Sequence, residues 1–527
     1  MAAAVWPSDH AGRQDRWHLA HSLVVGIMTS TNKTRTEFGD FQTPLELARE
    51  TCALLATKGL APASLLEPTC GTGTFLLAAL EQYQSVRTAV GLDINENYVK
   101  QAQHVISKTP HALKARIITS NFFQTRWTEI LRDLPDPLLV IGNLPWVTNA
   151  SLGSLGSSNL PEKSNFQKHR GLDAITGKGN FDISEWMMLR VVEWLSGRRA
   201  TFALLCKTAV ARKVLVHAWK QGSYIAYSEM YTIRASEYFR AAVDACLLVC
   251  TFEPRASSCD CAVYASLSST VPASVVGYRD HRLVADIDLY KRWKHLEGPE
   301  VYKWRSGIKH DCAQVLELER DGSQYKNQSG EKLDIEDTYV YPMLKSSELT
   351  NGKFVHPRRW MLVPQRSVGE DTDLIRETAP KTWRYLSEHA HLLDRRASSI
   401  YKDRPRFSVF GVGQYSFLPW KVAISGFYKH FNFRLVGPSA NKPVMLDDTA
   451  YFIGCKTKDE GECITDLLNS QTAKDFFRAF VFWDAKRPIT AELLRRLSLV
   501  ALAKEVWPQA RFQHFLLNDA RIQQPLI

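Results

Sequence analysis

Long uninterrupted hydrophobic runs are absent from this 527-residue chain. A membrane-spanning helix needs roughly 20 consecutive apolar residues, and no segment approaches that length. The nearest stretch, residues 19–28, is short and contains His21 and Ser22, and no credible cleavage site follows it. We therefore expect a cytoplasmic protein with no membrane partner. Residues 1–30 are expected to be an N-terminal extension, with Met1 or Met28 as the natural start.

Internal repeats, coiled-coil heptads and low-complexity tracts are also lacking. The hydrophobic content of 45% and the charged content of 23% are ordinary for a globular protein. At roughly 100–200 residues per domain, the chain is long enough for two or three domains. A net charge of +11 and a pI near 9.0 suit either a polyanionic partner or simple solubility.

The chain has ten cysteines, but they lack the spacing of paired cysteines that is typical of structural zinc sites. Most of them lie in apolar surroundings, as Cys246 and Cys250 do on a predicted strand. This placement is typical of reduced thiols in a cytoplasmic protein. Cys259 and Cys261 flank an Asp and leave zinc open as an alternative, but the preferred expectation is that no metal is bound.

A glycine-rich turn at residues 67–75 follows a predicted strand and opens a predicted helix. Gly71 and Gly73 permit positive φ and let a ligand approach the backbone. The third Gly of a dinucleotide fingerprint and the Lys of a P-loop are absent, which argues against both kinds of site.

Short strand-like runs alternate with amphipathic stretches over residues 35–255. This pattern predicts an α/β fold with a parallel sheet covered by helices on both faces. Four successive predicted strands, at residues 64–66, 89–92, 115–119 and 138–141, are followed by polar side chains. Such side chains gather at the carboxyl edge of the sheet, where open α/β folds bind ligands.

The fourth of these strands runs into Asn143-Leu144-Pro145-Trp146. A carboxamide, a main-chain carbonyl and a flat ring at one point suit a planar amino-bearing guest such as a nucleobase. A strand followed by a simple proline turn is the alternative. Structural roles also remain open at two positions. Thr43, with Pro44 at the first helical position, can cap a helix, and Asp93 can cap the next helix as well as bind a ribose.

Taken together, these segments closely resemble the gamma group of S-adenosylmethionine-dependent DNA methyltransferases, which modify the exocyclic amine of adenine. The order of motifs is the same: Thr-Pro, Gly loop, Asn-Pro-aromatic motif, then a target-recognition domain. The motifs cover residues 35–255, and a looser similarity covers most of the remainder. The resemblance implies a Rossmann-like class I methyltransferase sheet followed by a mixed α+β target-recognition domain. It implies a catalytic domain at residues 31–280 and a recognition domain at residues 281–527.

The resemblance also implies a role for individual residues. The implied S-adenosylmethionine site comprises Thr43, Glu67, Thr69, Gly71, Gly73, Asp93, Asn121, Phe122 and Asn143. The implied catalytic residues at the target base are Asn143, Leu144, Pro145 and Trp146. Trp146 and Phe239 are expected to stack on the extruded base. The family usually has Asp where Asn121 stands and Pro where Leu144 stands, which puts cofactor contacts and loop geometry in question.

Basic residues are expected to contact double-stranded DNA. Those singled out lie in a Gly/Ser/Asn-rich connection and in basic-aromatic clusters farther along, and are Lys163, Lys168, Arg170, Lys178, Arg358, Arg359, Arg404 and Arg406. A solvated loop and an ordinary protein surface are the alternatives.

Other activities remain open at this point. They are methylation of a protein glutamine, methylation of adenine in RNA, and a catalytically impaired methyltransferase-like subunit that only binds DNA. No Asp…Glu-x-Lys unit stands in a domain of its own, so a fused nuclease is not expected. A separately encoded restriction endonuclease and a monomeric protein are expected instead.

Overall fold

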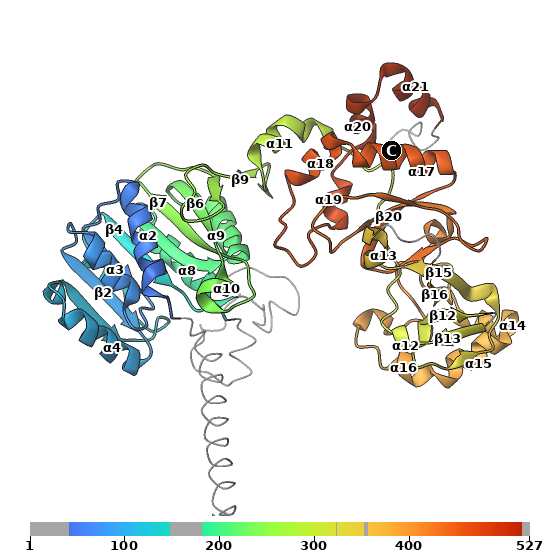
Figure 1. The fold of residues 1–527 in the computed structure, drawn as a ribbon, viewed down its shortest axis with the longest axis horizontal. Helices are drawn as coiled ribbons and strands as arrows, with labels where there is room; N and C mark the ends of the chain where they lie inside the picture. The colour runs from blue at the N-terminus through green and yellow to red at the C-terminus, as the bar shows by residue number, and fades with distance from the viewer. Residues whose placement is uncertain (1–41, 148–181, 323, 352–356, 519–527) are drawn as a thin grey trace, which may run out of the picture. The chain divides into compact units, whose positions relative to one another are not determined.

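The computed structural model describes residues 42–147, 182–322, 324–351 and 357–518. The chain divides into two compact units, which we call unit 1, ending at Leu283, and unit 2, beginning at Val284 (Figure 1). The boundary expected from the sequence lies between residues 280 and 281. Within the described ranges, no helix is both long and apolar enough to cross a membrane.

Unit 1 is built on one large sheet. Its strands are β1 (Ser64–Glu67), β2 (Thr88–Asp93), β3 (Ala115–Thr119), β4 (Leu138–Asn143), β5 (Ala200–Lys207), β6 (Ile225–Ile233), β7 (Ala245–Phe252), β8 (Asp260–Tyr264), β9 (Ser274–Arg279) and β10 (Arg282–Val284). They lie in the order β10-β9-β8-β6-β7-β5-β4-β1-β2-β3. The strands from β3 to β5 in this order are parallel, whereas β7 runs antiparallel to both β5 and β6. The α/β class predicted from the sequence is confirmed.

The strand order reverses beside β1. The chain moves outward from β1 to β2 and β3, then returns to β4 on the other side of β1. The loops leaving the carboxyl ends of β1 and β4 therefore diverge, and open parallel sheets bind ligands at such a point.

Two apolar cores hold unit 1 together because the central strands are buried on both faces. Side chains of β4 alternate between the cores: Leu138 and Val140 enter one, while Leu139 and Ile141 enter the other. The helices are α2 (Leu45–Thr57), α3 (Thr74–Gln82), α4 (Glu96–Ser107), α5 (Trp127–Arg132), α8 (Ile183–Leu195), α9 (Thr208–Gln221) and α10 (Ala235–Phe239). Residues of α2, α3 and α4 belong to one core, and residues of α5, α8 and α9 belong to the other.

Unit 2 contains two smaller sheets. Its strands are β11 (Arg305–Ser306), β12 (Glu317–Asp321), β13 (Gln324–Asn327), β14 (Lys332–Leu333), β15 (Val340–Leu344), β16 (Arg359–Leu362), β17 (Trp420–Ser425), β18 (Arg434–Val436), β19 (Met445–Leu446) and β20 (Ala450–Cys455). One sheet has the order β14-β13-β12-β16-β15-β19, and the other has the order β11-β20-β17-β18. Apart from the parallel pair β15 and β19, the paired neighbours are antiparallel.

Helices accompany both sheets of unit 2. They are α11 (Ile287–Trp293), α12 (Ala313–Leu316), α13 (Ser346–Asn351), α14 (Ile375–Thr378), α15 (Pro380–Glu388), α16 (Ala390–Asp394), α17 (Lys458–Asn469), α18 (Gln471–Arg478), α19 (Ala491–Arg495), α20 (Leu499–Val506) and α21 (Gln509–Asn518). Residues of α14, α15 and α16 share a core with the six-stranded sheet, and residues of α17, α18 and α20 share one with the four-stranded sheet. Unit 2 is therefore a mixed α+β structure.

Candidate active site

A cleft lies at the carboxyl edge of the unit 1 sheet, where β1, β2 and β4 end. Most of the cofactor-site and catalytic residues singled out from the sequence line it. They are Thr43, Glu67, Thr69, Gly71, Asp93, Phe122, Asn143 and Pro145. The cleft is therefore where the strand order reverses, as the sheet topology requires.

The glycine turn shapes one wall of this cleft. Gly71 has φ +48° and Gly73 has φ +82°, a region that side chains rarely adopt. A Cβ at position 71 would lie 2.7 Å from Gln42 Oε1, and one at position 73 would lie 2.9 Å from Ala102 Cβ. Both glycines are needed for the chain to turn from β1 into α3.

Asp93 connects the glycine turn to the end of β2. Its Oδ2 accepts a hydrogen bond from Gly71 N at 2.8 Å, and its Oδ1 accepts one from Asn95 N at 2.8 Å. Asp93 also lines the cleft, and a carboxylate is a suitable acceptor for ribose hydroxyls. Asp93 does not cap α4: the cap is Asn95, whose side chain accepts from Asn97 N.

Glu67 is the most deeply buried acid of the cleft, with 3% of its surface exposed. Burial raises its pKa well above the ordinary value, against the hydrogen bond from Leu76 N, and the nearby Asp93 raises it further. Its Cγ lies 3.3 Å from where a Cβ at position 142 would stand, and Gly142 has φ +154°. A cationic ligand group in this cleft would favour the ionised form of Glu67.

Thr43 does not cap helix α2. Pro44, with φ −58° and ψ 140°, occupies the N-cap position of α2, and no side chain caps the helix. Ala48 N donates to Pro44 O, so the helix begins one residue later than a cap at Thr43 requires. The capping role of Thr43 and the first-turn position of Pro44 are therefore wrong, and Thr43 faces the cleft.

Asn143 stands at the end of β4, beside the glycine turn. Thr69 Oγ1 donates a hydrogen bond to Asn143 O at 3.2 Å, which ties the loop after β1 to the end of β4. Asn143 and Pro145 both line the cleft, whereas the Leu144 side chain is buried in the core that α8 and α9 share. The Asn-Leu-Pro segment thus presents a carboxamide and a proline ring to the same space as the glycine turn.

The two aromatic side chains expected to stack on a base are adjacent. Trp146 and Phe239 are both buried, and their rings meet edge to face with centroids 5.1 Å apart and an interplanar angle of 68°. The Trp146 ring N–H donates to Leu205 O at 3.4 Å. A base can enter between these rings only if they separate.

Asn121 and Phe122 differ in placement. Phe122 lines the cleft and packs on Trp127 and Trp194 with ring centroids 4.9 and 5.5 Å away. Asn121 is not among the lining residues, and its Oδ1 accepts from Phe123 N at 2.9 Å. The neighbouring Ser120 lines the cleft in its place.

Sequence reasoning missed several lining residues, including Gln42, Tyr98 and Met187. Gln42 Oε1 accepts from Thr72 N at 3.3 Å, so this side chain braces the glycine turn. Its position directly before Thr43 was an available signal. Met187 comes from α8, far along the chain, and nothing in its local sequence marks it.

Metal binding gains no support from the part of the chain that the structure describes. There, no group of three or more His, Cys, Asp or Glu side chains is placed to hold an ion. None of the ten cysteines forms a disulfide, and Cys261, on β8, is buried.

The basic residues expected at DNA fall into three groups. Lys163, Lys168, Arg170 and Lys178 lie outside the described residues. Arg358 and Arg404 are exposed on unit 2. Arg406 forms an ion pair with Asp394 at 2.7 Å, and Arg359 forms one with the buried Glu317 at 3.8 Å.

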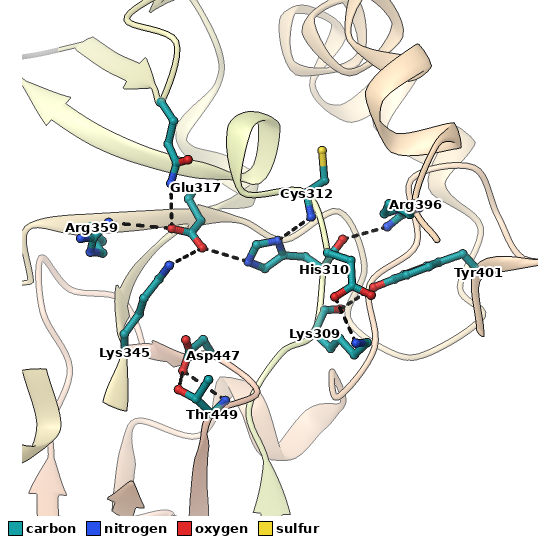
Figure 2. A network of polar contacts seen from close by, with 12 residues as sticks. Lys309, His310, Cys312, Glu317, Lys345, Arg359, Arg396, Tyr401, Asp447 and Thr449 are labelled. Carbon is teal, nitrogen blue, oxygen red and sulfur yellow. Dashed lines mark hydrogen bonds and ion pairs between the residues drawn. The ribbon is translucent and has the colours of Figure 1, made fainter. Parts of the chain in front are cut away.

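A polar cluster around Glu317 occupies the six-stranded sheet of unit 2 (Figure 2). Glu317 is 4% exposed, and Lys345 Nζ and His310 Nε2 lie 2.6 and 3.3 Å from its Oε1. Arg359 Nη1 and Gln328 Nε2 lie 3.8 and 3.2 Å from its Oε2. Burial would raise the pKa of Glu317, but the hydrogen bonds from His310 and Lys345 outweigh it and lower the pKa to about 2.

Comparisons with known proteins agree with this geometry. No family model matches the sequence. The type II methyltransferase M.NspV of Nostoc sp. (strain ATCC 29411 / PCC 7524) is 45% identical over 484 residues, which cover 91% of this chain and 100% of that protein. A structure of the type IIL restriction-modification enzyme MmeI in complex with DNA aligns with 92% of this chain and 68% of that chain, at 13% identity and a TM-score of 0.52.

The likeness to MmeI shows a shared fold. A putative class I S-adenosylmethionine-dependent methyltransferase from Listeria monocytogenes also aligns, at 17% identity and a TM-score of 0.30, over 43% of this chain and 67% of that chain. The predicted class I methyltransferase fold is confirmed by the sheet topology of unit 1 and by the likeness to MmeI. Because M.NspV matches at 45% identity along its entire length, the chain belongs to the type II methyltransferases of restriction-modification systems.

Proposed function

We propose that this protein transfers a methyl group from S-adenosylmethionine to N6 of adenine within a specific sequence of double-stranded DNA. One observation carries the proposal: Asn143 and Pro145 line the same cleft as Gly71 and Asp93. The groups suited to a nucleobase amine are thus placed directly beside the groups suited to a nucleoside cofactor.

The residues of the cleft fit the cofactor. Gly71, which has positive φ, brings the backbone of the turn to the cleft without a side chain, and the Asp93 carboxylate at the cleft suits ribose hydroxyls. Glu67 is a buried acid that suits the cationic methionine end, and Phe122 offers a ring face to adenine. When bound, S-adenosylmethionine supplies a methyl group activated by a positive sulfonium.

The chain itself prepares the acceptor nitrogen. Adenine N6 is a weak nucleophile because its lone pair is delocalised into the ring. The Asn143 carboxamide oxygen and the Leu144 carbonyl oxygen each accept a hydrogen bond from the N6 amine. These two bonds favour a tetrahedral nitrogen whose lone pair is available for methylation. Positioning of this kind supplies part of the roughly 7–11 kcal/mol that proximity effects can contribute. The nitrogen loses a proton once the new N–C bond forms, so no strongly basic side chain is required beforehand.

The target amine is inaccessible inside a duplex, so the base must be extruded, at a cost of a few kcal/mol. Stacking on Trp146 and Phe239 offsets that cost by roughly 1–3 kcal/mol per stacked base. Because these rings contact each other here, the proposal requires that they part when the base enters.

Unit 2 is proposed to recognise the DNA sequence. Its exposed Arg358 and Arg404 are suited to phosphate contacts, which orient a protein on a duplex without reading bases. In this proposal the enzyme acts on DNA in the cytoplasm of a bacterial cell. A separately encoded restriction endonuclease and a monomeric state stay predictions.

The test is expression of the protein in a bacterial host that lacks DNA methyltransferases, followed by single-molecule sequencing of the host DNA. We expect N6-methyladenine in one short sequence context, and none in a host that expresses Asn143→Ala. Methylated cytosine, or unmodified DNA alongside active enzyme, would contradict the proposal. In parallel, tritiated S-adenosylmethionine with purified DNA, RNA and protein acceptors separates DNA methylation from the RNA and protein-glutamine alternatives.

A further inference from the structure

Lys207 contacts both the segment after β4 and the residue before α8. It is the last residue of β5 and directly precedes α9. Its Nζ donates to Trp146 O at 3.1 Å and forms an ion pair with Asp182 Oδ2 at 2.6 Å. One ammonium group therefore joins the segment after β4 to the residue before α8.

Asp182 is itself firmly placed. It is 8% exposed, caps α8 by accepting from Ser184 N, and also accepts from Ser184 Oγ. Ile183 N donates to Val147 O at 2.9 Å, which adds a second link between the start of α8 and the segment after β4. Lys207 thus connects Trp146 to a fixed point rather than to a mobile side chain.

The register of the sheet explains why this matters for the Asn143 segment. Asn143 pairs with Leu205 in the parallel β4–β5 ladder, so the last hydrogen-bonded position of β4 precedes Trp146 by three residues. Beyond it, Trp146 is attached to the β5 end twice, by its ring N–H to Leu205 O and by its own carbonyl to Lys207. The backbone from Asn143 to Trp146 is consequently held at both ends.

We propose that Lys207 is a positioning residue for methyl transfer, which fixes the Asn143–Trp146 backbone through the Trp146 carbonyl and Asp182. This inference rests on the proposed function, because it takes that segment as the target-base site. Lys207 touches neither base nor cofactor in this account. Its loss shifts the acceptor oxygens of Asn143 and Leu144, and displacements near 1 Å can lower rates about 100-fold.

A closely matched control exists in the same helix pair. Lys213, on α9, forms an ion pair with Glu185 of α8 at 2.8 Å, and Glu185, like Asp182, is buried. Both Lys→Met changes remove a cation from a buried acid near the start of α8. Only Lys207→Met also removes a donor from the Trp146 carbonyl.

The experiment measures kcat, KM and thermal stability for wild type, K207M, K207R, D182N and K213M, with tritiated S-adenosylmethionine and unmethylated bacterial genomic DNA. Cofactor Kd is measured by calorimetry. We expect kcat of K207M to fall about 100-fold with cofactor Kd within about twofold. K207R retains a donor and recovers most of that loss, D182N loses about tenfold, and K213M keeps wild-type kcat although its stability falls.

Wild-type kcat in folded K207M would overturn the inference, as would losses in K213M that match those in K207M. If K207M does not fold, wild-type kcat in both K207R and D182N overturns it, whereas a loss in D182N that K207R does not share supports it. Failure of the proposed function looks different: the wild-type enzyme would then methylate another acceptor, on which the same variants are compared.

Discussion

The cleft of unit 1 and the Glu317 cluster of unit 2 satisfy polar groups in opposite ways. In the cleft, Asp93 and Glu67 accept hydrogen bonds from backbone N–H groups of Gly71, Asn95 and Leu76. In the cluster, Glu317 is surrounded by side chains, among them the cationic Lys345 and Arg359. The acids of the cleft therefore face a space suited to a cationic ligand, whereas Glu317 already has its cations.

This difference distinguishes a ligand-binding site from a cluster that stabilises the fold. A buried acid that accepts from a backbone N–H group, as Glu67 does from Leu76 N, is favoured in its ionised form when a cation arrives. A buried acid already paired with cations is strongly destabilised when a partner is removed, by roughly 3–5 kcal/mol. Changes in the cleft should consequently alter binding and catalysis, and changes at Glu317 should alter the stability of unit 2.

The largest expected effect is at the cleft. Asn143→Ala should lower kcat by about 10²- to 10³-fold, the scale seen when one preorganised polar group of an active site is removed. Cofactor affinity should stay within a few-fold, since the cofactor's methionine and ribose contacts come from other strand ends. Methyl incorporation and calorimetry measure the two quantities. Asn97→Ala, on the exposed side of α4, is the control, and a wild-type rate in Asn143→Ala would refute the assigned role.

The next effect is on stability. The pKa of Glu317 lies near 2, below its ordinary 4.5, so its ionisation contributes stability above pH 4.5 that is lost as the pH falls toward 2. Glu317→Gln should lower the free energy of unfolding by about 3 kcal/mol at pH 7, and the difference from wild type should shrink across that window. Urea unfolding at several pH values measures it.

The control for Glu317 is an exposed ion pair of the same unit. Asp394→Asn, which breaks the pair with Arg406, should cost less than about 1 kcal/mol because exposed pairs contribute little. If both variants lost the same free energy of unfolding, or if Glu317→Gln lost cofactor binding, the Glu317 cluster could not be assigned a purely stabilising role distinct from that of the cleft.

A smaller effect concerns pH and the cofactor. Burial raises the pKa of Glu67, so the free protein holds this acid protonated over a wider range than an exposed Glu. A cationic ligand favours the carboxylate form of Glu67, so binding should release a proton. Cofactor affinity should therefore rise with pH, by up to about tenfold per pH unit, as long as the pH is below the pKa of Glu67 in the free protein. Calorimetry from pH 5.5 to 8 tests this, with Glu67→Gln expected to give a flat profile. A flat wild-type profile would contradict it.

The smallest expected effect distinguishes two neighbouring arginines. Arg358→Ala should weaken DNA binding nearly equally across sequences and reduce the salt dependence by about one counterion. Arg359→Ala should act mainly on stability, because Arg359 is paired with Glu317. Binding titrations at several salt concentrations, combined with unfolding curves, separate the two effects. An unchanged salt slope in Arg358→Ala would exclude it as a phosphate contact.

Much of unit 1 was predictable because its determinants are local. The apolar run before Asn143 and the two glycines after β1 each specify structure within a few residues, and the four strands named from the sequence match β1 to β4 to within two residues at each end. The capping of α2 was predicted wrongly because the same Thr-Pro pair fits either of two adjacent positions. Met187 and Lys207 were missed because only the folded sheet brings them to the cleft and to Trp146.

Unit 2 was predictable only in class. The partners of Glu317 include Gln328 and Arg359, which come from different segments and carry no local pattern. Interleaved aromatic and basic residues indicated a nucleic-acid surface, yet Arg359 and Arg406 are engaged by acids of their own unit. Composition shows which charges are present, but only the fold shows which of them are already neutralised.

The edge-to-face contact of Trp146 with Phe239 has a consequence for selectivity among small molecules. Such a pair gains about 0.5–1.5 kcal/mol beyond its buried area, and a lone nucleoside must overcome that gain with no duplex contacts to help. Under the proposed function, free adenosine and ATP therefore compete poorly with the extruded DNA base for the space between these rings. Millimolar adenosine should leave the methylation rate of saturating DNA unchanged, and strong inhibition that DNA relieves would show that the rings part too easily for this to hold.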